Sequence, residues 1–130
     1  MINQDRKTGI LIWQVSNYWQ NKLRKILKEY NMTLNEYLVL HSITEINKMR
    51  KTSNQSQLSF FSGIDISVVS VVLKLLEKKK LIKRNFLEDS RKKNIEILFS
   101  GKTLFHKIHP KIVLEEEKLF KKINEEKNNF

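Results

Sequence analysis

The chain has 130 residues, of which 40% are apolar and 30% are charged, and its formal net charge is +11. This composition is typical of one soluble globular domain and excludes an intrinsically disordered chain. The absence of cysteine excludes disulfides, thiolate zinc sites and thiol redox chemistry. Because no apolar run approaches the ~20 residues that cross a bilayer, and the N-terminus lacks a signal-peptide pattern, we expect a cytoplasmic protein with no membrane partner.

The positive charge is densest in residues 66–98. That segment carries nine basic and four acidic side chains, a net charge of +5, against +4 for residues 1–65 and +2 for residues 99–130. A protein surface that follows nucleic-acid phosphates needs such a density of cations. The alternative is that lysine only keeps the surface of the protein solvated.

A long amphipathic helix is predicted for residues 10–30, after a polar and frayed segment at residues 1–8. Its apolar side chains recur three or four residues apart: Ile12, Val15, Trp19, Leu23, Ile26, Leu27 and Tyr30. Trp13 and Tyr18 lie beside this stripe. A stripe this broad on a terminal helix indicates a partner subunit, and packing within one chain is the alternative.

Two capping patterns predict where the next helices begin. Thr33, followed by Glu36, forms a capping box for a helix that ends near Ile46. Asn54 and Gln57 form a weaker one for a short helix that ends near residue 61. The apolar side chains of this short helix that are expected to face the core are Leu58 and Phe61.

A tight turn at residues 62–64 and a cap at Asp65 predict a further helix over residues 66–79. Its buried stripe is expected to consist of Val69, Val72, Leu73 and Leu76. The opposite side carries Ser67, Ser70, Val71, Lys74 and Lys78. Because β-branched residues are frequent here, a buried strand over residues 66–73 is the competing interpretation.

Residues 81–86 and 94–98 predict two short antiparallel strands around a charged turn. Helix, turn, helix and basic hairpin, in this order, is the layout of a winged helix-turn-helix. In that unit the second helix enters the DNA major groove and the hairpin touches the backbone or the minor groove. Serine hydroxyls on the second helix can meet base edges, and Val68 and Val71 can contact thymine methyl groups.

The turn of the hairpin contains a pair of opposite charges. Asp89 can hold the guanidinium of Arg91 through two hydrogen bonds and aim it outward, as insertion into a narrow minor groove requires. An ordinary solvated turn is the equally simple alternative.

Ser100 is predicted to cap a last helical region, in which Pro110 breaks or kinks the helix. Its apolar stripe runs to about residue 127 and consists of Leu104, Phe105, Ile108, Ile112, Leu119, Phe120 and Ile123. His106 and His109 are spaced as a possible metal pair, but the ligand set is incomplete, so we expect no metal site and no cofactor. His41 is expected to be a packed or surface residue.

Nothing in the sequence indicates catalysis. It contains no glycine-rich phosphate loop, no nucleophile elbow and no HExxH motif, and its serines and histidines are not spaced as a triad. We therefore do not expect an enzyme.

Residues 58–84, which run from the helix-turn-helix into the hairpin, resemble the corresponding segment of the MarR (multiple antibiotic resistance regulator) family. The Asp89-x-Arg91 pattern and the strand around Ile95 match that family in place. Ser100-Gly101-Lys102 stands where the family has a Thr-x-x-Gly entry to the next helix. The short chain is also similar to the small staphylococcal accessory regulators of the same superfamily.

The resemblance implies a mainly α (α+β) winged helix-turn-helix with N- and C-terminal dimerisation helices. Residues 1–130 would form a single domain. Its dimerisation helices would be residues 10–30 and 100–127, and residues 33–98 would form the DNA-binding core, with the wing at about 81–98.

The function implied is a sequence-specific transcriptional regulator, a repressor, that binds double-stranded DNA at a pseudo-palindromic operator as a homodimer and responds to a small-molecule effector. The DNA-binding residues would be Ser67, Ser70, Val71, Lys74, Lys78, Arg91, Lys92 and Lys93, with Asp89 orienting Arg91. The effector pocket would use Trp13, Tyr18 and Trp19. The competing functions are a winged-helix module for protein or RNA contacts and non-specific architectural DNA binding.

Two features depart from the family pattern. Lys80 stands where glycine commonly ends the helix, which predicts a strained left-handed residue or a different helix end. The second helix of the unit is also poor in arginine and glutamine, which favours shape readout and phosphate contacts over direct base readout.

Overall fold

The computed structural model describes residues 2–49, 52–86 and 93–128. Its elements, in chain order, are α1 (Ile2–Lys28), α2 (Leu34–Met49), α3 (Gln55–Ser62), α4 (Ile66–Lys78), β1 (Ile82–Phe86), β2 (Lys93–Ile97) and α5 (Phe99–Asn128). β1 and β2 pair antiparallel with Ile82 opposite Ile97, and Ser53 adds a single bridge to Ile95. The predicted fold class, a mainly helical chain with a helix-turn-helix and a hairpin, is confirmed.

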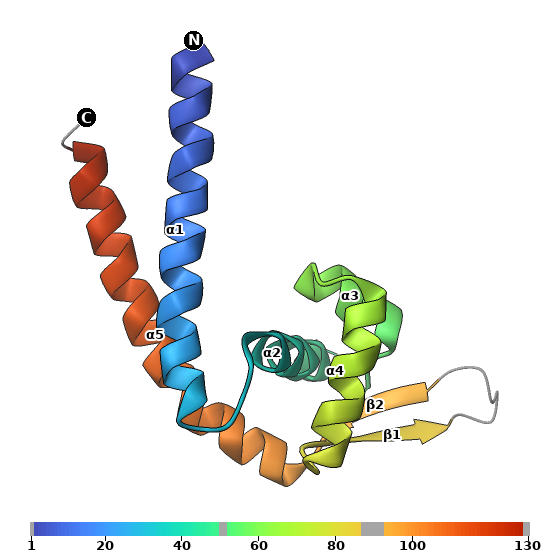
Figure 1. Ribbon diagram of the computed structural model, residues 1–130. Helices are drawn as coiled ribbons and strands as arrows, with labels where there is room; N and C mark the ends of the chain where they lie inside the picture. Colours follow the sequence, from blue (N-terminus) through green and yellow to red (C-terminus); the bar gives the residue numbers. More distant parts are fainter. Residues whose placement is uncertain (1, 50–51, 87–92, 129–130) are drawn as a thin grey trace.

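The elements form two regions (Figure 1). α1 and the C-terminal part of α5 lie side by side as two long arms, and both chain ends lie at the same end of the molecule. α2 lies at the centre of the second region, where it contacts α3, α4 and β2 as well as α1 and α5. The hairpin lies on the far side of α2 from the arms, so α2 connects the arms to the helix-turn-helix.

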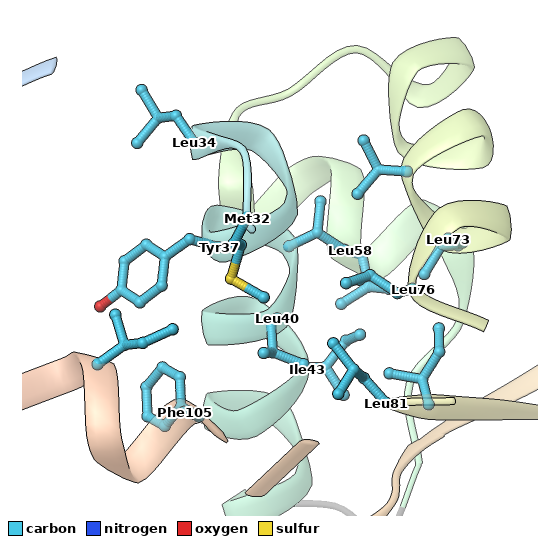
Figure 2. Close-up of a cluster of buried hydrophobic side chains, with 14 of the residues drawn as sticks. Met32, Leu34, Tyr37, Leu40, Ile43, Leu58, Leu73, Leu76, Leu81 and Phe105 are labelled. Atoms are coloured by element: carbon cyan, nitrogen blue, oxygen red, sulfur yellow. The ribbon is translucent and has the colours of Figure 1, made fainter. Parts of the chain in front are cut away.

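Figure 2 shows the side chains that are buried around α2. Leu40 of α2 packs among residues that include Leu58 from α3 and Leu76 from α4, and all three are fully buried. Farther along the same core, the ring of Tyr37 stacks on Phe105 of α5 with the ring centroids 6.0 Å apart. One continuous core therefore holds α3, α4 and the start of α5 against α2.

Both predicted capping boxes are present. The backbone N–H of Glu36 donates to Thr33 Oγ1 and that of Thr33 donates to Glu36 Oε1, each at 3.1 Å. Asn54 and Gln57 exchange the same pair of hydrogen bonds at 2.9 Å. Gly63 then ends α3 with φ 75°, a left-handed conformation that glycine adopts without strain.

α4 is a helix rather than the alternative strand. Asp65 is its N-cap and accepts a hydrogen bond from the backbone N–H of Ser67. The four side chains predicted to form its inward stripe are all buried: Val69, Val72, Leu73 and Leu76. Because the β-branched residues disfavour an isolated helix, packing of this stripe against α2 and α3 stabilises α4.

The C-terminal end of α4 contains a strained residue, as predicted. Lys80 has φ 61°. Its backbone N–H donates to the carbonyl oxygen of Glu77, and the backbone N–H of Leu81 donates to the carbonyl oxygen of Leu76. These two bonds form a Schellman motif, in which glycine usually occupies the left-handed position.

Replacing Lys80 by glycine is expected to raise the free energy of unfolding by about 1 kcal/mol, because the left-handed conformation costs a residue with a Cβ. Urea unfolding followed by circular dichroism measures this change. Lys80→Ala, which keeps the Cβ, is the control and is expected not to stabilise the protein. Equal stability of the glycine and alanine variants would contradict the strain.

Three predicted helix limits were wrong. α1 begins at Ile2 rather than at residue 10, because extending a formed helix by polar residues costs little once it is nucleated. α2 continues to Met49, beyond the predicted end at Ile46. Ser100 does not cap α5, which begins at Phe99; its hydroxyl instead donates to the carbonyl oxygen of Lys80 at 2.6 Å.

Pro110 lies inside α5 and does not end it. α5 changes direction along its length (Figure 1), which is the usual effect of a proline inside a helix. The helix continues because it is held by contacts with α2 before the bend and with α1 after it. Phe61 was also predicted wrongly: Leu58 is buried, but Phe61 is 49% exposed.

None of the described helices is, by itself, long and apolar enough to cross a bilayer. Among the described helices, α3 and α4 together have the length and apolar content of a membrane span, but they are bent by 111° relative to one another.

Candidate nucleic-acid interface

The outer face of α4 carries the side chains that the sequence singled out. Ser67, Val71, Lys74 and Lys78 are exposed, and Ser70 is half-buried. Their spacing places them on the side of the helix opposite the buried stripe. The packing of that stripe therefore determines which side chains α4 presents to the surface.

The N-terminal end of α4 is organised by Asp65. Its carboxylate accepts hydrogen bonds from both the hydroxyl and the backbone N–H of Ser67. These two hydrogen bonds hold the pKa of Asp65 below its usual value, and the bond from the hydroxyl has the larger effect. The Ser67 hydroxyl donates its proton within the protein, so it can act only as an acceptor toward a ligand.

Side-chain hydrogen bonds attach the same end of α4 to α3. Gln55 Nε2 donates to the carbonyl oxygen of Ile66 at 3.2 Å. The Ser59 hydroxyl donates to the carbonyl oxygen of Ile64 at 2.7 Å. These bonds fix the turn between the two helices, and with it the direction in which α4 leaves α3.

The other end of α4 is attached to the start of α2. Lys79 Nζ lies 2.7 Å from Glu36 Oε2 and donates to the carbonyl oxygen of Asn31 at 2.6 Å. The Glu36 side chain is only 3% exposed. Within the described part of the chain, Lys79 is the cation that the structure places beside this buried carboxylate. The ion pair therefore links the orientation of α4 to the segment that joins α1 and α2.

The hairpin is held against α4 by a second ion pair. The Arg84 guanidinium of β1 donates to both carboxylate oxygens of Glu77, at 3.1 and 3.2 Å, and the Arg84 side chain is 12% exposed. On the hairpin itself, Glu96 accepts from Asn85 and lies 3.4 Å from Lys83 Nζ. Sequence analysis missed the Arg84–Glu77 pair, because nothing in the pattern indicates which cation reaches back from the strand to the helix.

The predicted tip of the wing is only partly described. Asp89, Arg91 and Lys92 lie outside the described residues. Lys93 is described by its backbone alone, as the first residue of β2. What the structure establishes for the wing is its base, where β1 lies against α4 and the paired strand β2 lies against α2.

A second candidate site lies between the arms. A groove of about 700 Å³ is lined by Leu11, Ile12, Val15, Ser16, Trp19, Glu116, Leu119, Phe120 and Ile123. The indole N–H of Trp19 donates to Glu116 Oε2 at 3.0 Å, which joins α1 to α5. Tyr18 lines a smaller neighbouring cavity of about 190 Å³, and Lys122 Nζ lies 4.8 Å from the centre of its ring. Trp13 is 67% exposed and lines neither space.

A cluster of rings joins α2 to α5. The Tyr37 hydroxyl lies 3.1 Å from His109 Nδ1, and the ring centroids of His41 and His109 are 5.6 Å apart. Burial raises the pKa of Tyr37 and lowers that of His41, which is partly packed. Over the described residues, no group of three or more His, Cys, Asp and Glu side chains is placed to hold a metal ion.

Several solved structures share this fold. A complex of MepR from S. aureus with DNA superposes with a TM-score of 0.80 and 24% identity, over 94% of this chain and 88% of MepR. MarR from E. coli gives a TM-score of 0.74 and 20% identity, over 88% and 82%. BpsR from Bordetella bronchiseptica, whose DNA binding is regulated by 6-hydroxynicotinic acid, gives 0.77 and 16%, over 88% and 84%.

Sequence comparison identifies the family. A B. subtilis (strain 168) protein, an uncharacterized HTH-type transcriptional regulator called YdcH, is 36% identical over 77 residues, which are 59% of this chain. This chain spans about half (52%) of that relative. The model of the transcriptional regulator SarA/Rot family matches residues 21–108, which include α2, α3, α4 and the hairpin. The chain therefore belongs to the SarA/Rot family of transcriptional regulators.

Proposed function

We propose that this transcriptional regulator binds double-stranded DNA sequence-specifically as a homodimer, and that it represses transcription from a pseudo-palindromic operator. The observation that carries the proposal is the orientation of α4. Its apolar stripe faces the core, and its outer face presents Ser67, Val71, Lys74 and Lys78. A helix presented in this way, next to a basic hairpin, suits the major groove and its phosphates.

Each predicted DNA-binding residue has a proposed role. Ser67, Ser70 and Val71 would meet base edges, and Lys74 and Lys78 would contact phosphates. At the wing, Arg91, oriented by Asp89, would enter the minor groove, and Lys92 and Lys93 would contact the backbone. The DNA complex of MepR is a precedent for DNA binding by a protein of this fold.

The arms supply the proposed dimer interface. Ile12 and Phe120 line the groove between α1 and α5 and are 64% and 70% exposed, and Leu114 of α5 is 53% exposed. Apolar exposure of this extent along two long helices favours burial against the same helices of a second copy. Residues 10–30 and 100–127 would then form the dimerisation helices. A two-fold axis would relate the DNA-binding core of one subunit, residues 33–98, to that of the other.

The same groove is the proposed effector site. Trp19 and Glu116 line the groove of about 700 Å³. Tyr18 and Lys122 line the neighbouring cavity of about 190 Å³. Aromatic walls with a few polar groups suit a small aromatic molecule. The regulation of BpsR by 6-hydroxynicotinic acid is a precedent in a protein of this fold. Because Trp13 lines neither space, its contribution would require the second copy.

Two substitutions on α4 test the proposed readout. Ser70→Ala is expected to weaken binding to a selected duplex about 3- to 10-fold and to leave binding to a shuffled duplex unchanged, because the lost contact is to a base. Lys74→Ala is expected to weaken both and to lower the slope of log affinity against log salt by about 1, because the lost contact is to a phosphate.

Fluorescence anisotropy with full-length protein measures these affinities. Lys102→Ala removes an exposed cation from α5 and serves as the matched control, with expected affinities equal to those of the unsubstituted protein. An equal loss on the selected and shuffled duplexes for Ser70→Ala would contradict sequence-specific readout.

A further inference from the structure

The outer face of α4 is mainly aliphatic where a reading helix meets base edges. Four of its side chains are between 37% and 57% exposed: Ile66, Val68, Val71 and Leu75. Val71 is the most exposed of the four. It has Ser67 and Val68 one turn before it and Lys74 and Leu75 one turn after it, so it lies at the centre of the face.

This part of the helix lacks the side chains that read purines. Over residues 66–73, α4 contains no Arg, Lys, Asn or Gln, which are the residues that bind guanine or adenine through two hydrogen bonds. Of the two hydroxyls in this part of the helix, that of Ser67 donates to Asp65, and Ser70 is half-buried. The remaining exposed side chains at this end of α4 are therefore aliphatic.

The major groove offers one matching group. The C5 methyl of thymine is the apolar group that base pairs present there, and apolar side chains contact it directly. The cations that are proposed to contact phosphates, Lys74 and Lys78, lie in the C-terminal half of α4. Phosphate binding there would bring the aliphatic N-terminal half against the bases.

We propose that Val71, assisted by Val68, reads thymine methyl groups, so that each operator half-site carries thymine where Val71 enters the major groove. The proposal rests on the proposed function and adds its specificity element. The contact is rigid, because α4 is attached to α3 through Gln55 and Ser59 at one end and to α2 through Lys79 at the other.

Val71 can be shortened to alanine without disturbing the core of the protein. Its side chain is 57% exposed, so truncation to alanine leaves no core cavity, and alanine has the higher helix propensity. Met49, at the end of α2, is also an exposed apolar residue but lies outside the proposed interface. Met49→Ala is therefore the matched control.

The experiment uses full-length protein and duplexes selected by that protein from a random pool. Each thymine of the selected site is replaced in turn by deoxyuridine, which lacks only the C5 methyl. We expect at least one deoxyuridine per half-site to weaken binding about fourfold, the effect of losing one buried methyl. With Val71→Ala, the same replacement should change affinity by less than twofold, and with Met49→Ala the fourfold loss should remain.

The two protein variants distinguish a direct contact between Val71 and the thymine methyl from an effect of deoxyuridine on the stiffness of the duplex. If deoxyuridine acted only through the stiffness of the duplex, Val71→Ala would show the same loss as the unsubstituted protein, and the inference would be overturned. A selected site that no deoxyuridine weakens would also overturn it, while the proposed function would stand. If selection enriched no common site, the proposed function would fail, and the methyl readout with it.

Discussion

Replacing Gly101 by alanine is expected to lower the free energy of unfolding by about 2 kcal/mol. A Cβ at this position would lie 2.3 Å from the carbonyl oxygen of Leu81 and 2.8 Å from Ile97 Cγ1. The first of these atoms belongs to the backbone and also accepts a hydrogen bond from the N–H of Leu98 at 2.9 Å. Relief of the overlap must therefore move α5 away from the base of the hairpin. The free-energy cost of this movement is larger than the stabilisation that the higher helix propensity of alanine provides.

Gly9 provides the control for this substitution. It lies in α1, and a Cβ there would meet no atom within 4 Å. Gly9→Ala is expected to stabilise the protein by about 0.5–1 kcal/mol through helix propensity. Urea unfolding at one protein concentration compares the two variants, since the proposed dimerisation would make stability depend on concentration. Opposite signs support the close contact of α5 with the hairpin; equal, small effects would contradict it.

Lys79→Met is expected to destabilise the protein by about 2 kcal/mol. The substitution keeps the length of the side chain but leaves the buried Glu36 carboxylate without its cation, 2.7 Å away in the structure. Loss of one partner of a fully buried pair costs about 3–5 kcal/mol. Here the Lys79 side chain is 32% exposed, so water reaches the pair and lowers the cost.

Two further variants isolate the ion pair. Lys78→Met, one residue earlier on the exposed side of α4, should change stability by less than about 0.5 kcal/mol. Adding Glu36→Gln to Lys79→Met should recover part of the loss, because the uncompensated charge is removed while the amide oxygen can still accept in the capping box. A loss for Lys79→Met no larger than that for Lys78→Met would mean that the pair does not stabilise the attachment of α4 to α2.

Local chemistry explains which features were predictable. The capping boxes at Thr33 and Asn54, the cap at Asp65 and the left-handed Lys80 depend on residues within a few positions of one another. The buried stripe of α4 followed from helical periodicity alone. Because these signals agree, the helix-turn-helix and the hairpin could be recognised before their packing was known.

Other features depend on contacts between distant residues. The Lys79–Glu36 and Arg84–Glu77 pairs join separate elements, and many other cations in this basic chain satisfy the same sequence pattern. Local rules also predicted that Ser100 would cap a helix, whereas packing places it beside the end of α4.

Exposure of apolar side chains was equally hard to predict. Phe61 has the spacing of a core residue but is half exposed, and the side chain that the short α3 buries is that of Leu58. The stripe on α1 is continuous in sequence, yet Leu23 is fully buried within the chain while Ile12 is exposed. Periodicity identifies an apolar face but does not tell which part of it is covered by the same chain.

The most direct test of sequence-specific DNA binding is an anisotropy titration of full-length protein against a selected duplex and a shuffled duplex of the same length, over a series of salt concentrations. We predict that the selected duplex binds about 10³-fold more tightly or better, with one dimer per site. Equal affinities for the two duplexes, both falling steeply with salt, would contradict this account and indicate architectural binding driven by counterion release.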